Sequence, residues 1–257
     1  GLGVRIAEQT KVIALEPGAA KTDKGTVTAP IILRATEGFT ATLPGSERDW
    51  LPLNSAQIIT EPLPPEVWQK IGWNGREIVG DFANAYCYCQ RTREGRIAVG
   101  GRGLPYRLGS QIDHRGTPDP DTIRHLIQIL NRHFPAASEA RIDHAWCGVL
   151  AVPRDWCATV GLDPKTGLGW AGGYVGVGVS TSNLAGRTLC DLTLGRNTNL
   201  TRLPWVGRRV RRWEPEPLRW IGVRGMYALF NAGDRREAKG GPTPSRLATL
   251  GHWLTGH

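Results

Sequence analysis

The chain has 257 residues, 40% of them hydrophobic, and a formal net charge of +9 at pH 7. This length and apolar content suffice for one large or two small domains with a buried core. No stretch approaches the roughly 20 consecutive apolar residues that a membrane-spanning helix needs, and no charged-then-apolar N-terminus indicates a secretory signal.

The first part of the chain predicts short strands separated by turns. We expect strands at residues 4–6, 11–15, 26–29 and 31–33. Asp23-Lys24-Gly25 predicts the turn of a hairpin. Ile31-Ile32-Leu33 is a continuous apolar run, which is typical of a fully buried strand. It leads into a polar, Gly-containing segment at residues 34–38, and ligands bind beyond such strand ends in open α/β sheets.

The middle of the chain predicts more strands and two helices. Strands are expected at residues 55–60, 77–79, 85–91, 96–100 and 142–152. A short helix is expected at residues 66–71. A longer helix begins after Asp119, which is a good cap, with Pro120 in the first turn. Its apolar residues repeat at helical spacing until Phe134-Pro135 ends it.

The last part of the chain combines a β-hairpin with helices. Strands at residues 157–161 and 168–171 flank a turn at 163–167. Residues 180–194 predict a helix that Gly195 ends. Beyond it, the chain is rich in Arg, Trp and Pro, and we expect one more helix within residues 215–231 and a flexible break at 239–244.

The cysteines favour a reducing environment rather than a metal centre. There are five of them, no C-x-x-C pair occurs, and the number is odd. Cys87-Tyr88-Cys89 places two thiols on one face of a strand, but C-x-C alone is a weak metal signal. The histidines have no metal-ligand spacing. We therefore predict unpaired, buried thiols in the cytoplasm and no metal site.

A short basic cluster contributes to the positive charge. It comprises Arg208, Arg209, Arg211 and Arg212. Such a patch can bind nucleic acid, or it can be a solvated surface that faces an anionic partner. No nucleic-acid-binding motif accompanies the charge, which favours the second interpretation.

The most informative segment is the glycine-rich stretch from Gly172 to Ser182, which follows a strand and opens a helix. Glycines let the backbone approach a ligand and adopt positive φ. Free N–H groups at the start of a helix favour an electron-rich partner, such as the pyrimidine carbonyls of a flavin. The alternative is a tight strand-to-helix turn without a ligand. The glycines together with three hydroxyl residues favour a ligand.

A literal G-x-G-x-x-G also occurs, at Gly167, Gly169 and Gly172. It spans a turn and the strand that follows, whereas the phosphate-binding fingerprint lies between a strand and a helix. We therefore predict no pyrophosphate-binding unit within these residues.

Several short motifs occur in an order that matches one known family. They are Gly3-Val4, Val12-Ile13, the hairpin of residues 22–29, residues 31–38, Thr60-Glu61-Pro62-Leu63, residues 91–101, Phe134-Pro135, Trp146-x-Gly148, Val160-Gly161, the glycine stretch and residues 183–192. In this order the chain, over about Gly3 to Gly195, resembles the C-terminal portion of the D-amino-acid-oxidase family, which includes glycine oxidase and sarcosine oxidase. The family's usual N-terminal segment with its G-x-G-x-x-G fingerprint is missing from these residues. The chain also lacks an initial Met, as a fragment or a processed product would.

The resemblance implies FAD as the cofactor, hydride transfer from a C–H bond next to an amine nitrogen, and reoxidation by O₂ or another acceptor. The substrate is then a small-molecule amine or amino acid. Carried over by position, the flavin-proximal residues are Gly173, Tyr174, Val175, Gly176 and Gly178, and Val12 lies near the adenine end. The candidate substrate-binding residues are Tyr86, Tyr88, Arg102 and Tyr106, for which ordinary packing or a solvated surface is an equal alternative. No catalytic residue is assigned.

Two departures from the family pattern bear on the substrate and the flavin. Several members place a carboxylate-binding Arg two residues after the glycine matched by Gly148, and this chain has Leu150 there, although Arg154 could compensate. An apolar side chain cannot make the bidentate carboxylate contact, which favours an amine over an α-amino acid. Glu37 stands where the family often has Gly, and its charge must be paired or solvated.

These inferences predict an α+β fold that contains a partial, Rossmann-like FAD-binding domain. The second part is a substrate domain with a mostly antiparallel sheet and flanking helices. The expected segments are 1–38 (FAD-binding), 39–155 (substrate-binding), 156–195 (a return to the FAD-binding domain) and 196–257 (a basic C-terminal tail). The alternatives to an oxidoreductase, which as a fragment would bind FAD poorly, are a degenerate, inactive fragment and a non-enzymatic module that binds nucleic acid or an anionic partner through its tail.

Overall fold

The computed structural model describes residues 3–101, 106–240 and 244–255. The chain divides into two compact units. Unit 1 comprises Gly1–Pro52 and Leu150–Pro215, and unit 2 comprises Leu53–Val149 and Glu216–His257. Each unit is therefore built from two separate stretches of the sequence. The expected domain boundaries, which rest on function rather than compactness, stay predictions.

Unit 1 begins with a small antiparallel sheet of β1 (Val12–Glu16), β2 (Ala19–Thr22) and β3 (Gly25–Thr28). The predicted hairpin turn at Asp23-Lys24-Gly25 joins β2 to β3. The strand predicted at residues 4–6 is wrong, because this segment is irregular and its Val4 and Ile6 side chains are 76% and 82% exposed. Within the described residues it pairs with no other strand, and a strand without a ladder partner is not stable.

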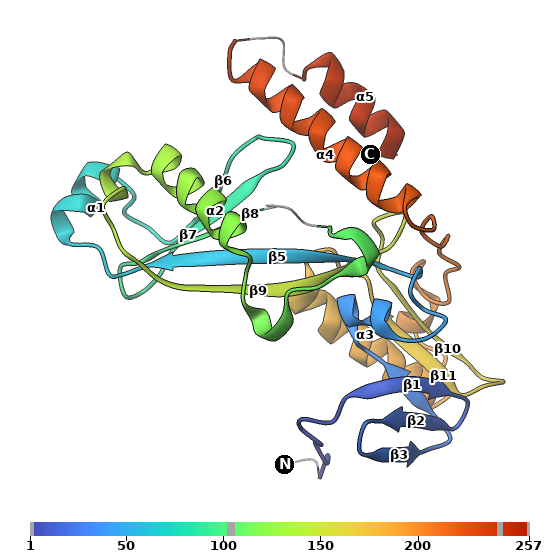
Figure 1. Ribbon diagram of the computed structural model, residues 1–257. Helices are drawn as coiled ribbons and strands as arrows, with labels where there is room; N and C mark the ends of the chain where they lie inside the picture. Colours follow the sequence, from blue (N-terminus) through green and yellow to red (C-terminus); the bar gives the residue numbers. More distant parts are fainter. Residues whose placement is uncertain (1–2, 102–105, 241–243, 256–257) are drawn as a thin grey trace. The chain divides into compact units, whose positions relative to one another are not determined.

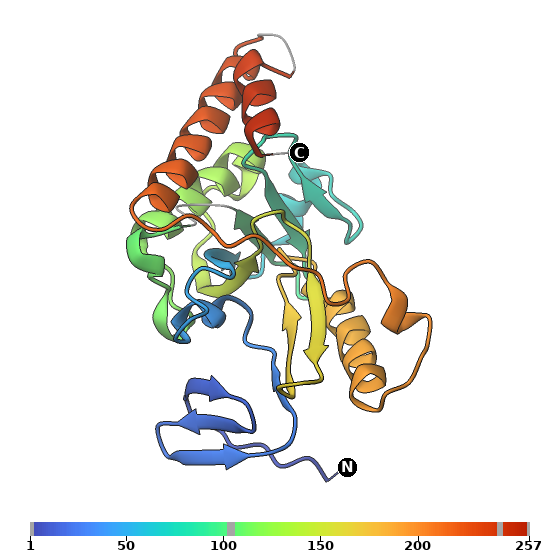
Figure 2. The same cartoon turned by 90° about the vertical axis from the view of Figure 1, so that its right-hand side faces the viewer.

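The second sheet of unit 1 carries the glycine-rich stretch. β11 (Leu168–Gly172) pairs in parallel with β4 (Ile32–Arg34) and antiparallel with β10 (Thr159–Asp163). Helix α3 (Gly178–Thr193) packs against β10 and β11 (Figure 2). β4 was predicted to be fully buried, but Leu33 is 45% exposed because β4 lies at the edge of this sheet.

Unit 2 is built on a five-stranded sheet in the order β6-β7-β8-β5-β9 (Figure 1). The strands are β5 (Leu51–Thr60), β6 (Ile78–Gly80), β7 (Cys87–Arg91), β8 (Ile97–Gly101) and β9 (Ile142–Val152). The pairs β6–β7, β7–β8 and β8–β5 are antiparallel. The mostly antiparallel sheet predicted from the sequence is thus present.

Helix α2 (Pro120–His133) covers one face of this sheet. Its cap is the predicted one: the Asp119 carboxylate accepts a 2.8 Å hydrogen bond from the Asp121 N–H. Leu126 and Leu130 of α2 pack into a core with Ile58 and Val99 of the sheet, and α1 (Pro65–Ile71) closes the end of this core. Short 3₁₀ turns are η1 (Glu37–Thr42), η2 (Leu108–Ser110), η3 (His114–Gly116), η4 (Pro135–Ala137) and η5 (Leu200–Arg202).

The last part of unit 2 is a pair of helices, α4 (Leu218–Glu237) and α5 (Arg246–Thr255), which contact each other. The predicted helix within residues 215–231 corresponds to α4, whereas α5 was not expected. The Asp234 carboxylate of α4 accepts hydrogen bonds from the Asn84 backbone and side-chain N–H groups, at 2.9 and 2.5 Å. This contact ties the helix pair to the segment that leads into β7.

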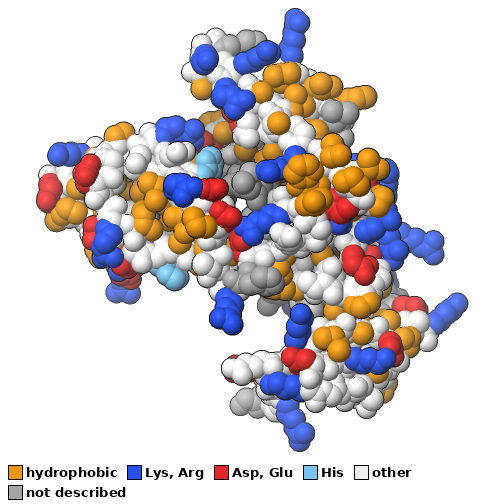
Figure 3. Space-filling view, viewed as in Figure 1, with side chains coloured by type: hydrophobic (Ala, Val, Ile, Leu, Met, Phe, Trp, Pro, Cys, Tyr) orange, Lys and Arg blue, Asp and Glu red, His pale blue; other side chains and the backbone are white. Residues whose placement is uncertain are grey.

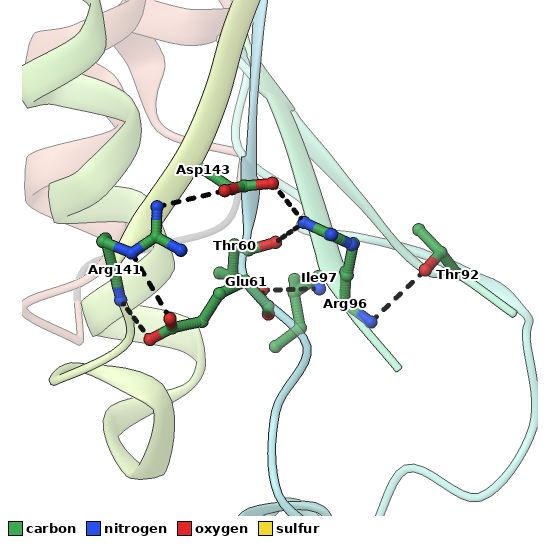
Figure 4. A network of polar contacts seen from close by, with 7 residues as sticks. All are labelled: Thr60, Glu61, Thr92, Arg96, Ile97, Arg141 and Asp143. Carbon is green, nitrogen blue, oxygen red and sulfur yellow. Dashed lines mark hydrogen bonds and ion pairs between the residues drawn. The ribbon is translucent and has the colours of Figure 1, made fainter. Parts of the chain in front are cut away.

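A polar network fixes the point where β5 ends (Figure 4). The buried Thr60 hydroxyl accepts a 3.0 Å hydrogen bond from the Ile97 N–H, and the Arg96 guanidinium donates to the Thr60 carbonyl at 3.0 Å. Arg96 also forms a 2.6 Å ion pair with Asp143 on β9. The Thr60-Glu61 pair of the matched motif therefore joins β5 to both of its neighbours, β8 and β9.

The surface charge is dispersed. On the face shown in Figure 3, Lys and Arg side chains lie among acidic and hydrophobic ones and do not form one band. Within the predicted basic cluster, Arg208 pairs with Asp155, Arg211 with Glu214 and Arg212 with Asp49. These carboxylates offset part of the positive charge. No helix in the described part of the chain is long and apolar enough to cross a membrane.

Candidate functional site

The glycine loop, residues 172–178, connects β11 to α3 in unit 1. Gly173, Val175 and Gly176 have φ angles of 75°, 51° and 96°, a region that side chains other than glycine rarely adopt. At Gly173 a Cβ atom would overlap the Pro153 ring, so only glycine fits there. The strained φ of Val175 is of the kind that functional loops retain. The loop thus presents its backbone rather than its side chains.

Helix α3 begins without a side-chain cap, at Val177. The hydroxyls of Thr181 and Ser182 do not cap it, because they donate back to the carbonyls of Val177 and Val179, at 2.6 and 3.3 Å. Two of the three hydroxyl residues that favoured a ligand are therefore occupied within the helix. The first-turn N–H groups and the helix dipole remain available to an electron-rich partner.

Glu37 anchors the glycine loop. Its carboxylate accepts hydrogen bonds from the N–H groups of Ala151 (2.8 Å) and Tyr174 (3.2 Å), and also from that of Gly173. Burial raises the pKa of Glu37, and these three hydrogen bonds oppose the rise. We expected the Glu37 carboxylate to be paired or solvated, and its partners are backbone N–H groups. Glu37 itself has a φ of 43°, so two strained residues, Glu37 and Val175, serve the same loop.

The side chain of Tyr174 points into the protein rather than to a ligand. It packs against the core formed by Val160, Ala171 and Leu189. Burial, and then the nearby charge of Glu37, raise the pKa of its phenol. The Tyr174 N–H donates to Glu37 and its carbonyl accepts from the Val177 N–H, so the cofactor role that the family resemblance implies for Tyr174 stays a prediction.

The departure at Leu150, and its possible compensation by Arg154, can be judged within unit 1. A Leu150 methyl carbon lies 3.9 Å from the Cβ position of Gly176, so an apolar side chain stands beside the glycine loop. The Arg154 guanidinium hydrogen-bonds both Glu214 carboxylate oxygens, at 3.2 and 3.3 Å, and lies 5.1 Å from the centroid of the Trp213 ring. Arg154 is therefore engaged elsewhere and supplies no free guanidinium to replace the missing Arg.

In unit 2, Tyr88 lies on the face of the sheet opposite α2. Cys87 and Cys89, its neighbours on β7, point into the core under α2, and strand alternation turns Tyr88 the other way. Gly100 of β8 pairs with Tyr88 on one side and with Gln57 of β5 on the other. A Cβ at Gly100 would overlap the Tyr88 ring, so the glycine lets the phenol cross β8 and accept a 3.2 Å hydrogen bond from the Gln57 amide.

The other candidate substrate residues differ from Tyr88 in their surroundings. Tyr106 is 1% exposed; its hydroxyl donates to the Glu216 carboxylate, and burial together with that contact raises its pKa to about 12. Tyr86 is 41% exposed, and Arg102 lies outside the described residues. Val12 is half-buried in β1, opposite Thr22. The binding roles of these residues stay predictions.

Sequence reasoning missed two contributors to these sites. Glu37 was noticed as a departure but not as the anchor of the glycine loop, and its polar residue type at a glycine position was the only signal. Gln57 gave no signal, because its contact with Tyr88 depends on the registers of two strand pairs.

Comparisons with known proteins agree with the fold. Residues 1–192 match the family model described as "FAD dependent oxidoreductase" (DAO). The chain is 28% identical over 208 residues to a probable oxidoreductase, OrdL, from Rhizobium meliloti (strain 1021), covering 77% of this chain and 44% of that protein. It is 27% identical over 223 residues to a gamma-glutamylputrescine oxidoreductase from Escherichia coli (strain K12), covering 82% and 49%.

Solved structures resemble it over similar lengths. Glycine oxidase from Geobacillus kaustophilus aligns with a TM-score of 0.64 at 19% identity, over 80% of this chain and 54% of that chain. L-proline dehydrogenase from P. horikoshii aligns with a TM-score of 0.60 at 22% identity, over 77% and 53%. The chain spans about half the length of the curated relatives it matches.

Proposed function

Since the chain belongs to the DAO family of FAD-dependent oxidoreductases, we propose that the protein containing it oxidises a C–N bond of a small amine or amino acid. Two named relatives, a gamma-glutamylputrescine oxidoreductase and a glycine oxidase, support this reaction class. When bound, FAD supplies the hydride acceptor and passes the electrons to O₂ or another acceptor.

The observation that carries the proposal is the glycine loop before the uncapped start of α3. A flavin ring needs backbone donors near its pyrimidine carbonyls and room for close approach. The exposed Gly176 provides the room, and the first turn of α3 provides N–H groups. Gly173, Tyr174, Val175, Gly176 and Gly178 are the residues that we assign to the flavin side, as the family resemblance implies. Glu37 keeps the loop in place by accepting the Tyr174 N–H.

We infer that the substrate is an amine rather than an α-amino acid. Leu150 offers no donor to a carboxylate, and Arg154 is held by Glu214 and Trp213. A guanidinium that left this pair for a substrate would give up its hydrogen bonds with Glu214. An apolar wall beside the glycine loop suits an alkyl amine or polyamine-like chain. We assign the substrate side to Tyr86, Tyr88, Arg102 and Tyr106, because the sequence places them on or just after strands that we expect to face the flavin.

The domain assignment follows from the same proposal. Residues 1–38 and 156–195 would form the remaining part of the FAD-binding domain, residues 39–155 the substrate-binding domain, and residues 196–257 a basic tail. The adenine end of FAD would lie near Val12. The other half of that site would come from the family's dinucleotide-binding segment, upstream of these residues.

We test the role of the loop with a matched pair of glycine substitutions in the protein extended by its own upstream sequence. Gly173→Ala introduces a Cβ that overlaps Pro153 and strains a φ of 75°. Gly186→Ala, in α3, meets no atom within 4 Å and serves as the control. We expect Gly173→Ala to weaken FAD retention by at least about tenfold, because a strained non-glycine residue costs about 1–3 kcal/mol. Gly186→Ala should retain FAD like the parent.

FAD retention is measured from the visible flavin absorbance after desalting, and folding is checked by far-ultraviolet circular dichroism. Equal retention by a folded Gly173→Ala protein and the control would exclude the loop as the flavin site. Bleaching of the flavin under anaerobic conditions is then compared between alkyl polyamines and α-amino acids. Faster bleaching by α-amino acids would overturn the amine preference but not the flavin site.

A further inference from the structure

Three side chains with metal-binding atoms meet in unit 2, whereas the glycine loop belongs to unit 1. Asp81 follows β6, Cys87 begins β7 and His133 ends α2. Their ligand atoms all lie within 4.8 Å of one another. No metal-ligand spacing in the sequence marks them, because the fold, not the local chain, brings them together. None of the three has a role in the proposed oxidation.

The distances between these atoms match the edges of a tetrahedral zinc site. Cys87 Sγ lies 3.5 Å from His133 Nε2, and His133 Nε2 lies 3.4 Å from an Asp81 carboxylate oxygen. Zinc bonds of about 2.0–2.3 Å at tetrahedral angles separate neighbouring ligand atoms by about 3.4–3.6 Å. The three groups are therefore spaced to share one cation without rearrangement of the backbone.

The backbone holds the ligands in place. The Cys87 N–H donates a 3.0 Å hydrogen bond to the second oxygen of Asp81, which orients the carboxylate. Cys87 is 2% exposed and packs with α2 and the sheet, so its sulfur has a fixed position. The Cys89 thiol hydrogen-bonds the Cys87 sulfur from the same face of β7. A thiol, an imidazole and a carboxylate with a second-shell donor are a donor set that zinc and cobalt prefer.

A cavity of about 460 Å³ adjoins one of the three residues. It is lined by Cys87 and Arg132, with Asp121, His125 and Asp234 among its other walls. In zinc sites with three protein ligands, water fills the fourth position.

One cation already competes for the position. The Arg132 guanidinium lies 3.1 Å from both Asp81 and His133 Nε2. Its side chain is 63% exposed, so it can turn into solvent when an ion binds. The position of Arg132 shows that this cluster attracts positive charge. Removal of the Arg132 charge should therefore favour the binding of a metal ion.

We infer that Asp81, Cys87 and His133 form a binding site for a divalent transition-metal ion, best matched by zinc. The ion would link the hairpin of β6 and β7 to the end of α2 beside the cavity. The binding of zinc requires the Cys87 thiol to release its proton to solvent, while Asp81 and His133 bind as carboxylate and neutral imidazole. The site is independent of FAD, so its test does not depend on the proposed function.

The test uses Co²⁺ as a spectroscopic probe of the chelator-treated, flavin-free chain. We expect one equivalent of Co²⁺ to give a thiolate-to-cobalt charge-transfer band and intense tetrahedral d–d bands, which Zn²⁺ then removes. Cys87→Ser should abolish the charge-transfer band. His133→Gln and Asp81→Asn should weaken binding by at least about tenfold, since even outer-shell changes cost 10–100-fold in metal affinity.

Two further variants separate a metal site from a purely structural network. Arg132→Gln should tighten Co²⁺ binding, whereas in a polar network without a metal it would only loosen the contact with Asp81. Cys157→Ser, at an exposed cysteine of unit 1, should leave the spectrum unchanged. The inference is overturned if no charge-transfer band appears, or if the band survives in folded His133→Gln and Asp81→Asn proteins with unchanged affinity.

Discussion

Glu37 is a partly buried carboxylate whose partners are backbone N–H groups rather than a cation. Burial disfavours its charged form and raises its pKa, while the N–H groups of Ala151, Tyr174 and Gly173 limit the rise. The folded protein therefore holds the Glu37 proton at pH values where the unfolded chain, with a pKa near 4.5, has released it. The protonation of Glu37 is therefore linked to folding.

This linkage predicts a pH-dependent difference between the parent chain and Glu37→Gln. The stabilising contribution of Glu37 is fully present below its unfolded pKa and decreases as pH rises through its higher folded pKa. The difference in unfolding free energy, parent minus Glu37→Gln, should therefore fall with rising pH across that window and then level off. Urea unfolding at a series of pH values measures it.

Glu47 serves as the control, because its pKa is shifted in the opposite direction from that of Glu37. The exposed Glu47 has a lowered pKa, mainly because its own backbone N–H and that of Gly45 bind its carboxylate. Its contribution is present above the unfolded pKa and is lost as pH falls. The parent-minus-variant difference for Glu47→Gln should therefore rise with pH. A Glu37→Gln difference that is flat or rises with pH would contradict the burial argument.

At the scale of elements, the end of β5 depends on a side chain that replaces part of the strand ladder. Paired residues between β5 and β8 end at Ile59 and Ala98, and the Thr60 hydroxyl then takes the Ile97 N–H. Thr60 and Ile97 are both fully buried, so an unpaired N–H there could not turn to water. The Thr60 carbonyl accepts a hydrogen bond from the Arg96 guanidinium (Figure 4).

We predict that Thr60→Val destabilises the chain by about 1–3 kcal/mol, the cost of leaving a buried donor unsatisfied. Valine has nearly the same shape, so the loss reports the hydrogen bond rather than a cavity. Thr60→Ser keeps the hydroxyl and should lose only about 0.8 kcal/mol for the missing methyl group. Urea unfolding followed by tryptophan fluorescence measures both. A valine variant as stable as the serine variant would show that the hydroxyl contributes little.

At the scale of the whole molecule, the chain covers about half of its curated relatives, so cofactor binding depends on what the other half provides. We predict that the present chain, incubated with FAD and desalted, keeps little colour. The same chain extended by its upstream sequence should keep the flavin bands, because the ADP half of the site is then complete. If the extended protein also stays colourless, the proposed function fails, whereas the metal site would be unaffected.

Structural features that depend on neighbouring residues could be predicted from the amino-acid sequence. The Asp119 cap and the apolar spacing after it predicted α2, and the alternating and apolar runs predicted most strands. The glycines and the strand before them located the glycine loop, and the literal fingerprint at Gly167, Gly169 and Gly172 lies in a turn and a strand, as predicted. Motif order identified the family. These signals come from neighbouring residues or from the order of motifs along the chain, so they can be recognised without knowledge of the fold.

Contacts between residues that are distant in the sequence could be identified only from the folded structure. Glu37 and Tyr174 are 137 positions apart, and their contact requires β4 and β11 to be neighbours in one sheet. Tyr88 reaches Gln57 only because two strand registers place Gly100 between them. Cys87 and His133 are 46 positions apart and meet because α2 ends over the start of β7. Strand register and helix docking are set by packing of the whole core, and no short-range pattern carries that information.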